Sequence, residues 1–210
     1  MNNYEYLISS LPLLTPEWRY SGDSSFGDIL SEIRRDCSAR DNELVDFLLE
    51  GFDADNLDSE FYSRALSHRN RFIREYFRFD LNLRNAKVGY LNSALGRPAG
   101  TDEISGTDEE GEIIFDGGEF EEEPKVRAIL AGSDILARER GLDDVLWAKI
   151  DELTVFDYFD IEAVLGFIAK LHIIDRWFIL DEESGRDMFR RLVDEVRGTF
   201  GGVRYDGSND

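Results

Sequence analysis

The chain has little of what enzymes and secreted proteins usually depend on. It contains one cysteine, two histidines and four prolines among 210 residues. A single cysteine excludes an internal disulfide and is typical of a reducing compartment. No basic segment followed by an apolar stretch opens the chain, and no run of eighteen apolar residues occurs in it. We therefore expect no signal peptide, no membrane insertion and a cytoplasmic location.

Basic residues are scarce as well, since 24 lysines and arginines stand against 45 acidic residues and give a net charge of −21. A charge of this sign repels phosphate groups, so we expect no nucleic-acid partner and no direct adhesion to anionic lipid. Hydrophobic residues nevertheless make up 42% of the chain and aromatic residues 12%. This content is enough for a buried core and predicts a globular protein.

The sequence lacks the usual motifs of catalysis and nucleotide binding. No Gly-x-x-x-x-Gly-Lys phosphate loop and no Gly-x-Gly-x-x-Gly motif after a strand is present. His68 and His172 lie within helical patterns without a second ligand four residues away, and Cys37 has no histidine near it in sequence. We expect no catalytic residue and no cofactor. The alternative, a small helical enzyme, requires a deep polar pocket around one of these three residues.

One acidic stretch has the spacing of a calcium loop. Its carboxylates fall at positions 1, 3, 5 and 12 of such a loop and are Asp108, Glu110, Glu112 and Glu119. The sixth position, where the sharp turn needs glycine, is Ile113. We therefore expect a solvated acidic loop and no metal.

Helical periodicity dominates the rest of the chain. Apolar residues recur every three, four or seven positions from Ser59 to Leu95, which predicts one long helix. Before it we expect an extended entry segment as far as Ser21, a helix capped by Ser24 or Ser25, and a short element capped by Asp41.

Four helical patterns follow an acidic loop. We expect one from Pro124 toward Gly141, one over residues 142–153, a long one capped by Asp160, and a last one over residues 183–200. Together these patterns predict an all-α bundle of about seven helices, of which one or two are long.

Composition divides the predicted bundle into parts. Residues 101–123 carry eleven acids and no base, so we expect residues 98–123 to form an exposed loop or mobile tether between helical halves 1–97 and 124–200. Within it, Asp116-Gly117-Gly118 predicts the turn of a small hairpin. Residues 201–210 are expected to be a loose tail.

An internal repeat is one interpretation of the two halves. An offset of 101 residues places residues 72–80 over residues 173–181 and Leu44-Val45 over Val145-Leu146, with similar residue types at most positions. The other interpretation is that any two amphipathic helices rich in aromatic residues align this well.

Arginines gather on the predicted long helix. Between Arg64 and Arg97 the chain has eight basic residues and two acids, a local charge of about +6. One interpretation is that they pair with carboxylates on neighbouring helices. The other is a docking stripe for an acidic protein partner, and the residues assigned to it are Arg71, Arg74, Arg78 and Arg84.

Three stretches of the sequence resemble a known family. They are the opening Tyr4-x-Tyr6-Leu7-Ile8-x-Ser10-Leu11-Pro12, the central Asn70-Arg71-Phe72-x-Arg74-Glu75-x-Phe77-Arg78-Phe79, which Leu83-Arg84-Asn85 follows, and the late Phe159-Asp160-Ile161-Glu162-Ala163-Val164-Leu165 with Arg176-Trp177. They resemble a bacterial family of unknown function whose members are encoded within V-type ATPase operons. Their place in the operon is the one where the connector subunit, named C or, in eukaryotes, d, would be expected.

The resemblance implies a role similar to that of the connector subunit. The connector is an all-helical, non-catalytic adaptor that couples the central stalk of the ATPase to its membrane rotor ring. The implied partners are therefore the stalk subunits and the ring, and the implied location is the cytoplasmic side of the membrane, held there by the complex. The alternative is an unrelated cytoplasmic helical scaffold or regulator, which long helices and the absence of catalytic motifs fit equally well.

Overall fold

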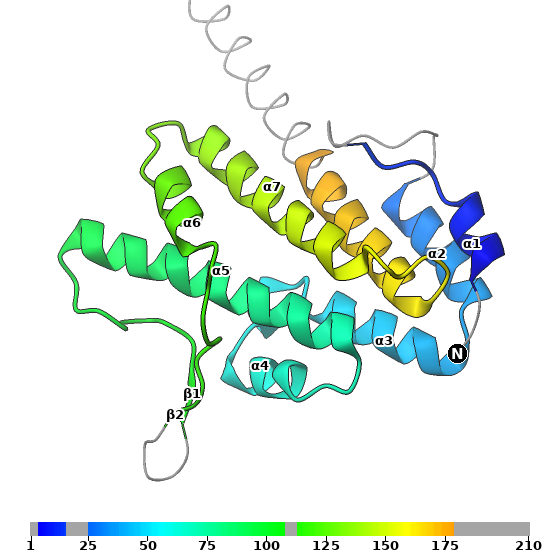
Figure 1. Cartoon of the computed structure of the whole chain (residues 1–210), viewed down its shortest axis with the longest axis horizontal. Coiled ribbons are helices and arrows are strands. Elements are labelled where there is room, and N and C mark those ends of the chain that lie inside the picture. Colours follow the sequence, from blue (N-terminus) through cyan, green and yellow to red (C-terminus); the bar gives the residue numbers. More distant parts are fainter. Residues whose placement is uncertain (1–3, 16–24, 108–112, 179–210) are drawn as a thin grey trace, which may run out of the picture. The chain divides into compact units, whose positions relative to one another are not determined.

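The computed structural model of the chain describes residues 4–15, 25–107 and 113–178 (Figure 1). The chain divides into two compact units, Met1–His172 and Ile173–Asp210. Of the second unit, residues 173–178 are described, and they are helical. All of the candidate interaction residues lie in the first unit.

The described residues are predominantly helical, which confirms the predicted all-α class. A two-stranded antiparallel ribbon pairs β1 (Gly106–Thr107) with β2 (Ile113–Phe115). A last helix covers residues 161–178. None of the helices within the described ranges has the length and apolar character needed to span a membrane. The other helices are α1 (Glu5–Ser10), α2 (Phe26–Asp36), α3 (Ala39–Glu50), the 3-10 helix η1 (Ala54–Asn56), α4 (Ser59–Leu66), α5 (Arg71–Leu95), α6 (Glu123–Leu130) and α7 (Ile135–Thr154).

The predicted extended entry segment is wrong for residues 5–10, which form α1. Tyr4 and Leu7 are both buried, and their spacing of three places them on one helical face. Packing of that face overrides the strand preference of the aromatic and β-branched residues. The residues from 16 to 24 lie outside the described part of the chain.

Helix α2 begins where the sequence predicts. The Ser25 hydroxyl accepts a hydrogen bond from the Asp28 backbone N–H, and the Asp28 carboxylate accepts one from the Ser25 N–H at 3.0 Å. This reciprocal pair is a capping box, and it satisfies two backbone donors at once. For α3 the predicted cap is wrong, because Ser38 caps the helix and Asp41 lies in its first turn.

The predicted single helix from Ser59 to Leu95 is also wrong. The chain breaks between α4 and α5, where the backbone N–H of Asn70 donates to Nδ1 of His68 at 3.0 Å. The Asn70 side chain then caps α5 by accepting from the Ile73 N–H at 3.0 Å. An asparagine that competes for backbone hydrogen bonds favours such a boundary even where the apolar period continues across it.

The boundary between α6 and α7 lies earlier in the chain than the sequence predicts. Pro124 lies in the first turn of α6 as predicted, but α6 ends at Leu130 and Asp134 caps α7, which continues through Gly141. A Cβ at Gly141 would lie 3.0 Å from the Ile129 side chain, so the glycine permits close packing of α7 on α6. The predicted cap Asp160 is confirmed, since its carboxylate accepts from the Ala163 N–H at 3.2 Å.

Helix α5 is central to the first unit. It contacts α4, α6 and α7, and it lies beside α7 in Figure 1. The rings of Phe61 and Phe77 meet edge to face at 4.9 Å, and Phe47 stacks on Phe61 at 5.3 Å. Phe61 and Phe77 are fully or almost fully buried. Aromatic packing therefore joins α3, α4 and α5 into one rigid body.

The acidic loop is tied to α5 rather than a free tether over its described residues. The amide groups of three asparagines on α5 donate to loop carbonyls: Asn82 to Gly117 at 3.1 Å, Asn85 to Ile104 at 2.8 Å and Asn92 to Thr101 at 2.6 Å. Their spacings of three and seven place them on one helical face. The loop thus follows this face of α5.

The strand pairing in the acidic loop differs from the predicted hairpin. Residues 113–115 pair with Gly106–Thr107 and not with residues 119–121. Gly117 has φ +87°, and a Cβ there would lie 2.0 Å from the Asn82 side-chain oxygen. The glycine is therefore needed for contact with α5. Of the four carboxylates with calcium-loop spacing, Glu119 is described, and Asp108, Glu110 and Glu112 lie outside the described part of the chain.

The predicted halves and their duplication stay predictions. At the offset of 101 residues, the helix that begins at residue 161 corresponds to the start of α4, but it runs without the break that separates α4 from α5. The predicted last helix, residues 183–200, and the predicted tail, residues 201–210, lie outside the described part of the chain.

Two glycines provide a test of the aromatic core. A Cβ at Gly51 would lie 2.3 Å from the Phe77 ring, whereas at exposed Gly27 the nearest atom would be 3.8 Å away. We expect Gly51→Ala to lower the free energy of unfolding by about 1–3 kcal/mol through overpacking. Gly27→Ala should raise it by less than about 1 kcal/mol, because alanine favours the helix. Urea unfolding measures both, and equal effects would contradict the packing described here.

Candidate interaction site at the junction of three motifs

The three motif stretches meet at one corner of the first unit. The backbone N–H of Tyr4 donates to the carbonyl of Phe159 at 2.7 Å. The side-chain amide of Asn70 donates to Oε1 of Glu162 at 2.9 Å. The opening, central and late motifs are far apart in the sequence, and the fold brings them together here.

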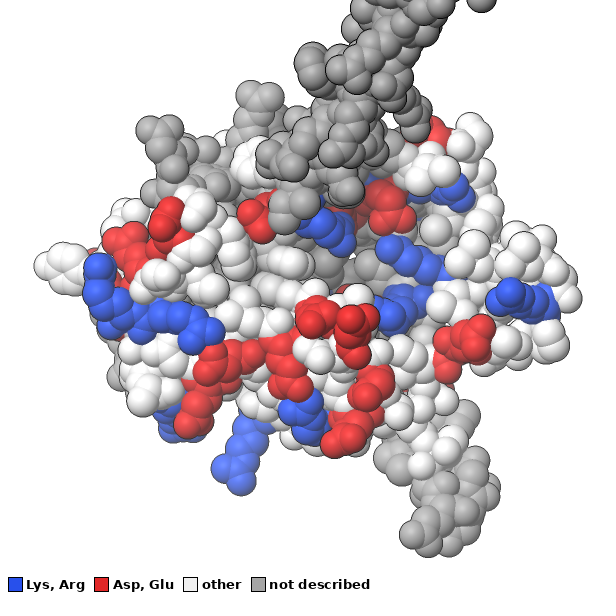
Figure 2. All heavy atoms as spheres, turned by 180° about the vertical axis from the view of Figure 1, so that it is seen from behind, with Lys and Arg blue, Asp and Glu red and all other residues white. Residues whose placement is uncertain are grey.

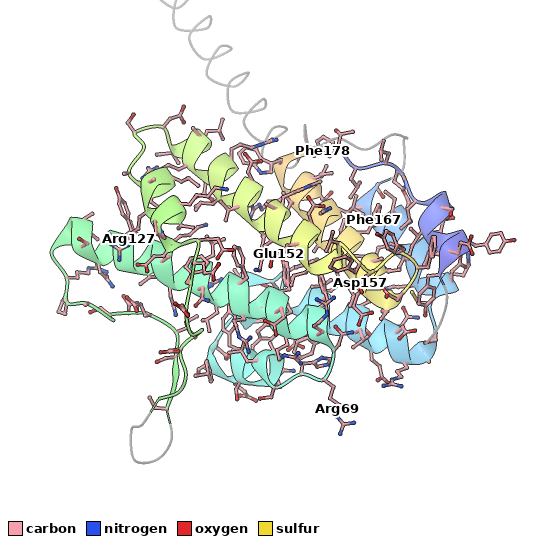
Figure 3. The ribbon with its side chains drawn as sticks, viewed as in Figure 1. Arg69, Arg127, Glu152, Asp157, Phe167 and Phe178 are labelled. Atoms are coloured by element: carbon pink, nitrogen blue, oxygen red, sulfur yellow. The ribbon has the colours of Figure 1, made fainter. Side chains whose placement is uncertain are left out.

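Arg71 joins the start of α5 to the end of α7. Its Nη2 atom donates to the carbonyl of Leu153 at 2.9 Å and to Oδ2 of Asp157 at 2.6 Å. Asp157 lies in the loop that follows α7 (Figure 3). The Asp157 side chain is 17% exposed, so the pair is partly shielded from water.

A second set of hydrogen bonds holds α1 to the start of α3. The Tyr4 hydroxyl donates to the Asp41 carboxylate and accepts from the Ser38 N–H at 3.2 Å. The Ser38 hydroxyl donates to the same carboxylate at 2.9 Å. Tyr4 therefore contacts α3 through its side chain and the loop after α7 through its backbone.

A hollow of about 1000 Å³ opens between these elements. Four arginines line it: Arg40, Arg64, Arg69 and Arg71. Arg64 pairs with Glu50 and Arg71 with Asp157, whereas Arg40 and Arg69 form no ion pair with the described residues. Figure 3 shows Arg69 pointing away from the ribbon at the turn between α4 and α5. The hollow is open and polar, and it is suited to a surface contact more than to an enclosed ligand.

Two ionisable groups at this hollow have shifted pKa values. Burial raises the pKa of the Glu162 carboxyl, and the nearby charges of Asp160 and Asp157 raise it further. Its Oε2 atom is buried and has no hydrogen-bond partner in the described part of the chain. Burial lowers the pKa of His68, and the charge of Arg74 adds to that effect. Both groups are therefore biased toward their neutral forms.

The four arginines assigned to partner binding have interactions within the chain. Arg71 is bound as described. Arg74 contacts Glu75 at 3.1 Å and the carbonyl of His68 at 3.0 Å, and Arg78 contacts Glu75 at 2.8 Å. Burial raises the pKa of the Tyr62 hydroxyl, and the charge of Arg84 acts on that hydroxyl in the opposite, smaller sense. On the face drawn in Figure 2, acidic and basic side chains lie interspersed. Their binding of a partner stays a prediction.

The other two candidate residues, Cys37 and His172, do not line the hollow. Cys37 is buried, and burial is the main cause that raises the pKa of its thiol to about 11. His172 stacks on the Phe52 ring at 4.0 Å and meets Phe26 edge to face. A thiol with a raised pKa is a poor nucleophile at neutral pH. Of the three residues named for an enzyme site, His68 lines the hollow.

Sequence patterns missed a group of exposed apolar residues at this corner. Phe156 is 83% exposed and Tyr158 is 67% exposed, in the loop between α7 and the following helix. Val155 and Phe159 are exposed beside them. The available signal was the Phe-Asp-Tyr-Phe-Asp sequence at 156–160, where aromatic residues lie between two helices instead of on a helix face. We call residues 155–160 the aromatic loop.

Substitution of Asn70 tests the junction. Asn70→Ala removes the α5 cap and the bond to Glu162, so we expect the free energy of unfolding to fall by about 1–2 kcal/mol. Asn70→Ser keeps a capping oxygen but lacks the amide donor, so its free energy of unfolding should fall by less. Chemical denaturation measures both variants. Wild-type stability of Asn70→Ala would contradict the two roles of this side chain.

Glu162 gives a prediction for pH dependence. Because its pKa is raised in the folded protein, the protonated form favours folding, and this contribution is lost as the pH rises through the folded pKa. We expect Glu162→Gln to raise the unfolding temperature at pH 7 and to lose that advantage below about pH 4. The exposed Glu152 on α7 (Figure 3) is a matched control, and Glu152→Gln should show no such trend. Parallel pH curves for the two variants would contradict the assignment.

Comparison with known proteins gives one match. The profile of one family, described as "Protein of unknown function (DUF2764)", matches residues 53–199. This range is more than half of the chain, and it includes the central and late motifs that meet at the junction. Searches of curated proteins and of solved structures each found no match. The chain therefore belongs to the DUF2764 family of proteins of unknown function.

Proposed function

We propose that the protein is a non-catalytic adaptor of a bacterial V-type ATPase, similar to the connector subunit, which couples the central stalk to the membrane rotor ring. The resemblance of the three motif stretches to proteins encoded in V-type ATPase operons suggests the complex. The convergence of these stretches at one surface corner supports the proposal, because residues that serve one contact are expected to lie together.

One observation carries the proposal of an adaptor: exposed apolar residues lie at both ends of the pair formed by α5 and α7. At one end is the aromatic loop. At the other end are Leu91, Leu95, Ile135 and Leu136, each more than half exposed. Exposed apolar groups concentrated in this way mark interaction surfaces more often than isolated ones do.

The two ends are held at a fixed separation. Arg71 at the start of α5 contacts Leu153 at the end of α7, and Lys87 lies 3.6 Å from Glu139 near the start of α7. The two helices are therefore antiparallel. The 25 residues of α5 span about 37 Å at 1.5 Å per residue. A rigid rod with a contact surface at each end is what an adaptor between two partners requires.

Rigidity along the rod comes from buried aromatic side chains. Phe72 stacks on Tyr76 at 5.6 Å, and Tyr76 meets Phe77 edge to face at 5.0 Å. All three are buried, so bending at the first turns of α5 would disrupt close packing. Torque transmission depends on such stiffness.

Native co-purification tests the function. A tagged full-length chain, expressed at its natural level, should enrich V-type ATPase stalk and ring subunits over an untagged control. Enrichment of other proteins without ATPase subunits would favour the alternative, an unrelated helical scaffold. Gene neighbourhood separates the same two possibilities at low cost.

The arginine stripe can be tested in the same assay. The ion pair of Arg78 with Glu75 is partly exposed and contributes little to stability, so Arg78→Glu should leave the fold intact. We expect it to lower the recovery of ATPase subunits several-fold if Arg71, Arg74, Arg78 and Arg84 meet an acidic face of the stalk or ring. Arg127→Glu on α6, which breaks a similar exposed pair with Glu123, is the matched control. Equal recovery of both variants would show that the stripe serves only the fold.

A further inference from the structure

The aromatic loop exposes more apolar surface than a short connection usually does. Four of its six residues are apolar, and their side chains range from 46% exposed for Phe159 to 83% for Phe156. The Tyr158 and Phe159 rings lie 6.5 Å apart and form one surface. Tyr6, two residues after the Tyr4 that binds the loop, is 94% exposed. Scattered single residues of this kind are common, but a continuous group marks a contact surface.

The backbone of this loop is held in place while its rings remain open to solvent. The Asp157 N–H donates to the Thr154 carbonyl at 3.0 Å, and the Phe159 carbonyl accepts from Tyr4 at 2.7 Å. Arg71 binds the loop through Asp157, and Asp160 caps the following helix. Because these bonds exist before binding, little conformational entropy is lost when the rings are covered.

An apolar groove continues the surface. It has a volume of about 300 Å³ and lies between residues 8–14 and the helix that begins at residue 161. Leu11, Leu14 and Phe167 line it, and Asp157 lies at its border. Phe167 and Asp157 are both labelled in Figure 3. A side chain of a partner that packs on the aromatic loop can therefore enter a recess next to it.

The charges around this surface are predominantly acidic. Two carboxylates, those of Asp157 and Asp160, belong to the aromatic loop, and one guanidinium, that of Arg71, neutralises part of their charge. Lys170, which also lines the groove, pairs with Asp151. Asp160 adds its negative charge beside that of Asp157. Together with the net charge of −21 of the chain, these carboxylates favour a cationic partner.

We infer that the aromatic loop and the adjoining groove dock a basic amphipathic helix of a partner protein. Its apolar residues would pack on Phe156, Tyr158 and Phe159 and enter the groove. Its lysines and arginines would lie over the open ring faces and beside Asp157 and Asp160. The inference rests on the proposed adaptor function, because it identifies the chemistry of one of the two partners.

Other occupants fit this surface less well. A second copy of the chain would bring the same acidic loop and another net charge of −21 against it. An anionic membrane would be repelled in the same way. An acidic partner segment suits the arginines that line the hollow, but not this loop. Charge complementarity therefore favours a basic helix.

A defined peptide probe tests the inference on the full-length protein. The probe is a labelled helical peptide with leucines on one face and lysines on the other, and its dissociation constant is measured by fluorescence anisotropy. Phe156→Ala with Tyr158→Ala should weaken binding at least tenfold. Leu91→Ala with Leu95→Ala, at the other end of the rod, is the matched control and should change it less than twofold. Both pairs replace exposed side chains, and thermal unfolding verifies that each variant is folded.

The outcomes separate the possible occupants. Weakening confined to the aromatic-loop variant, together with loss of binding when glutamates replace the lysines of the peptide, supports the inference. If both variants bind the peptide with the same dissociation constant, the peptide is attracted only by the overall negative charge, and the inference is overturned. A change from dimer to monomer in the aromatic-loop variant, seen by sedimentation, identifies a second copy as the occupant and also overturns it. Failure of the proposed function appears instead as absence of ATPase subunits in native co-purification, whatever the peptide does.

Discussion

The hydrogen bonds that Asn70 and Arg71 make across the first unit determine how its corner is built. Asn70 ends the break between α4 and α5 by capping α5, and its amide binds Glu162. Arg71 fixes the end of α7 and the loop beyond it through the Leu153 carbonyl and Asp157. Two adjacent residues thus set the start of α5, the end of α7 and the conformation of the aromatic loop that follows α7. A continuous helix through this point would have placed neither side chain where it could make these bonds.

The arginines illustrate how charge contrast in a sequence can have two meanings. A basic stretch in a chain of net charge −21 draws attention as a docking surface. Within the fold, Arg74 and Arg78 both contact Glu75, and Arg71 is bound to Asp157. The partly exposed pair of Arg78 with Glu75 adds little stability, so it leaves that guanidinium available for a stronger partner. Internal pairing and partner binding are therefore compatible uses of the same residues.

The acidic loop shows how polar residues on a helix can position a segment that has little secondary structure of its own. Asn82, Asn85 and Asn92 bind loop carbonyls along one face of α5, and Gly117 allows the backbone to approach Asn82. A buried carbonyl without a hydrogen-bond donor is costly. Each hydrogen bond from an asparagine amide therefore satisfies one loop carbonyl and fixes the position of that part of the loop. The described parts of the loop run along α5 for this reason.

Local sequence determined the helical class, the start of α2 at Ser24 or Ser25, the proline-led start of α6 and the cap at Asp160, because each depends on residues within one or two turns. It could not decide that α1 is helical or that β1 pairs with β2, since burial and contacts between distant segments settle these features. The break at Asn70 depends on local hydrogen bonds with His68 and Ile73, but the apolar period that continues across it masks the boundary in the sequence. The candidate site lies between these cases. Its motifs were visible in the sequence. Their contact, and the exposure of Phe156 and Tyr158 beside them, depend on the tertiary structure, because Tyr4, Asn70 and Arg71 bind residues that only folding brings near.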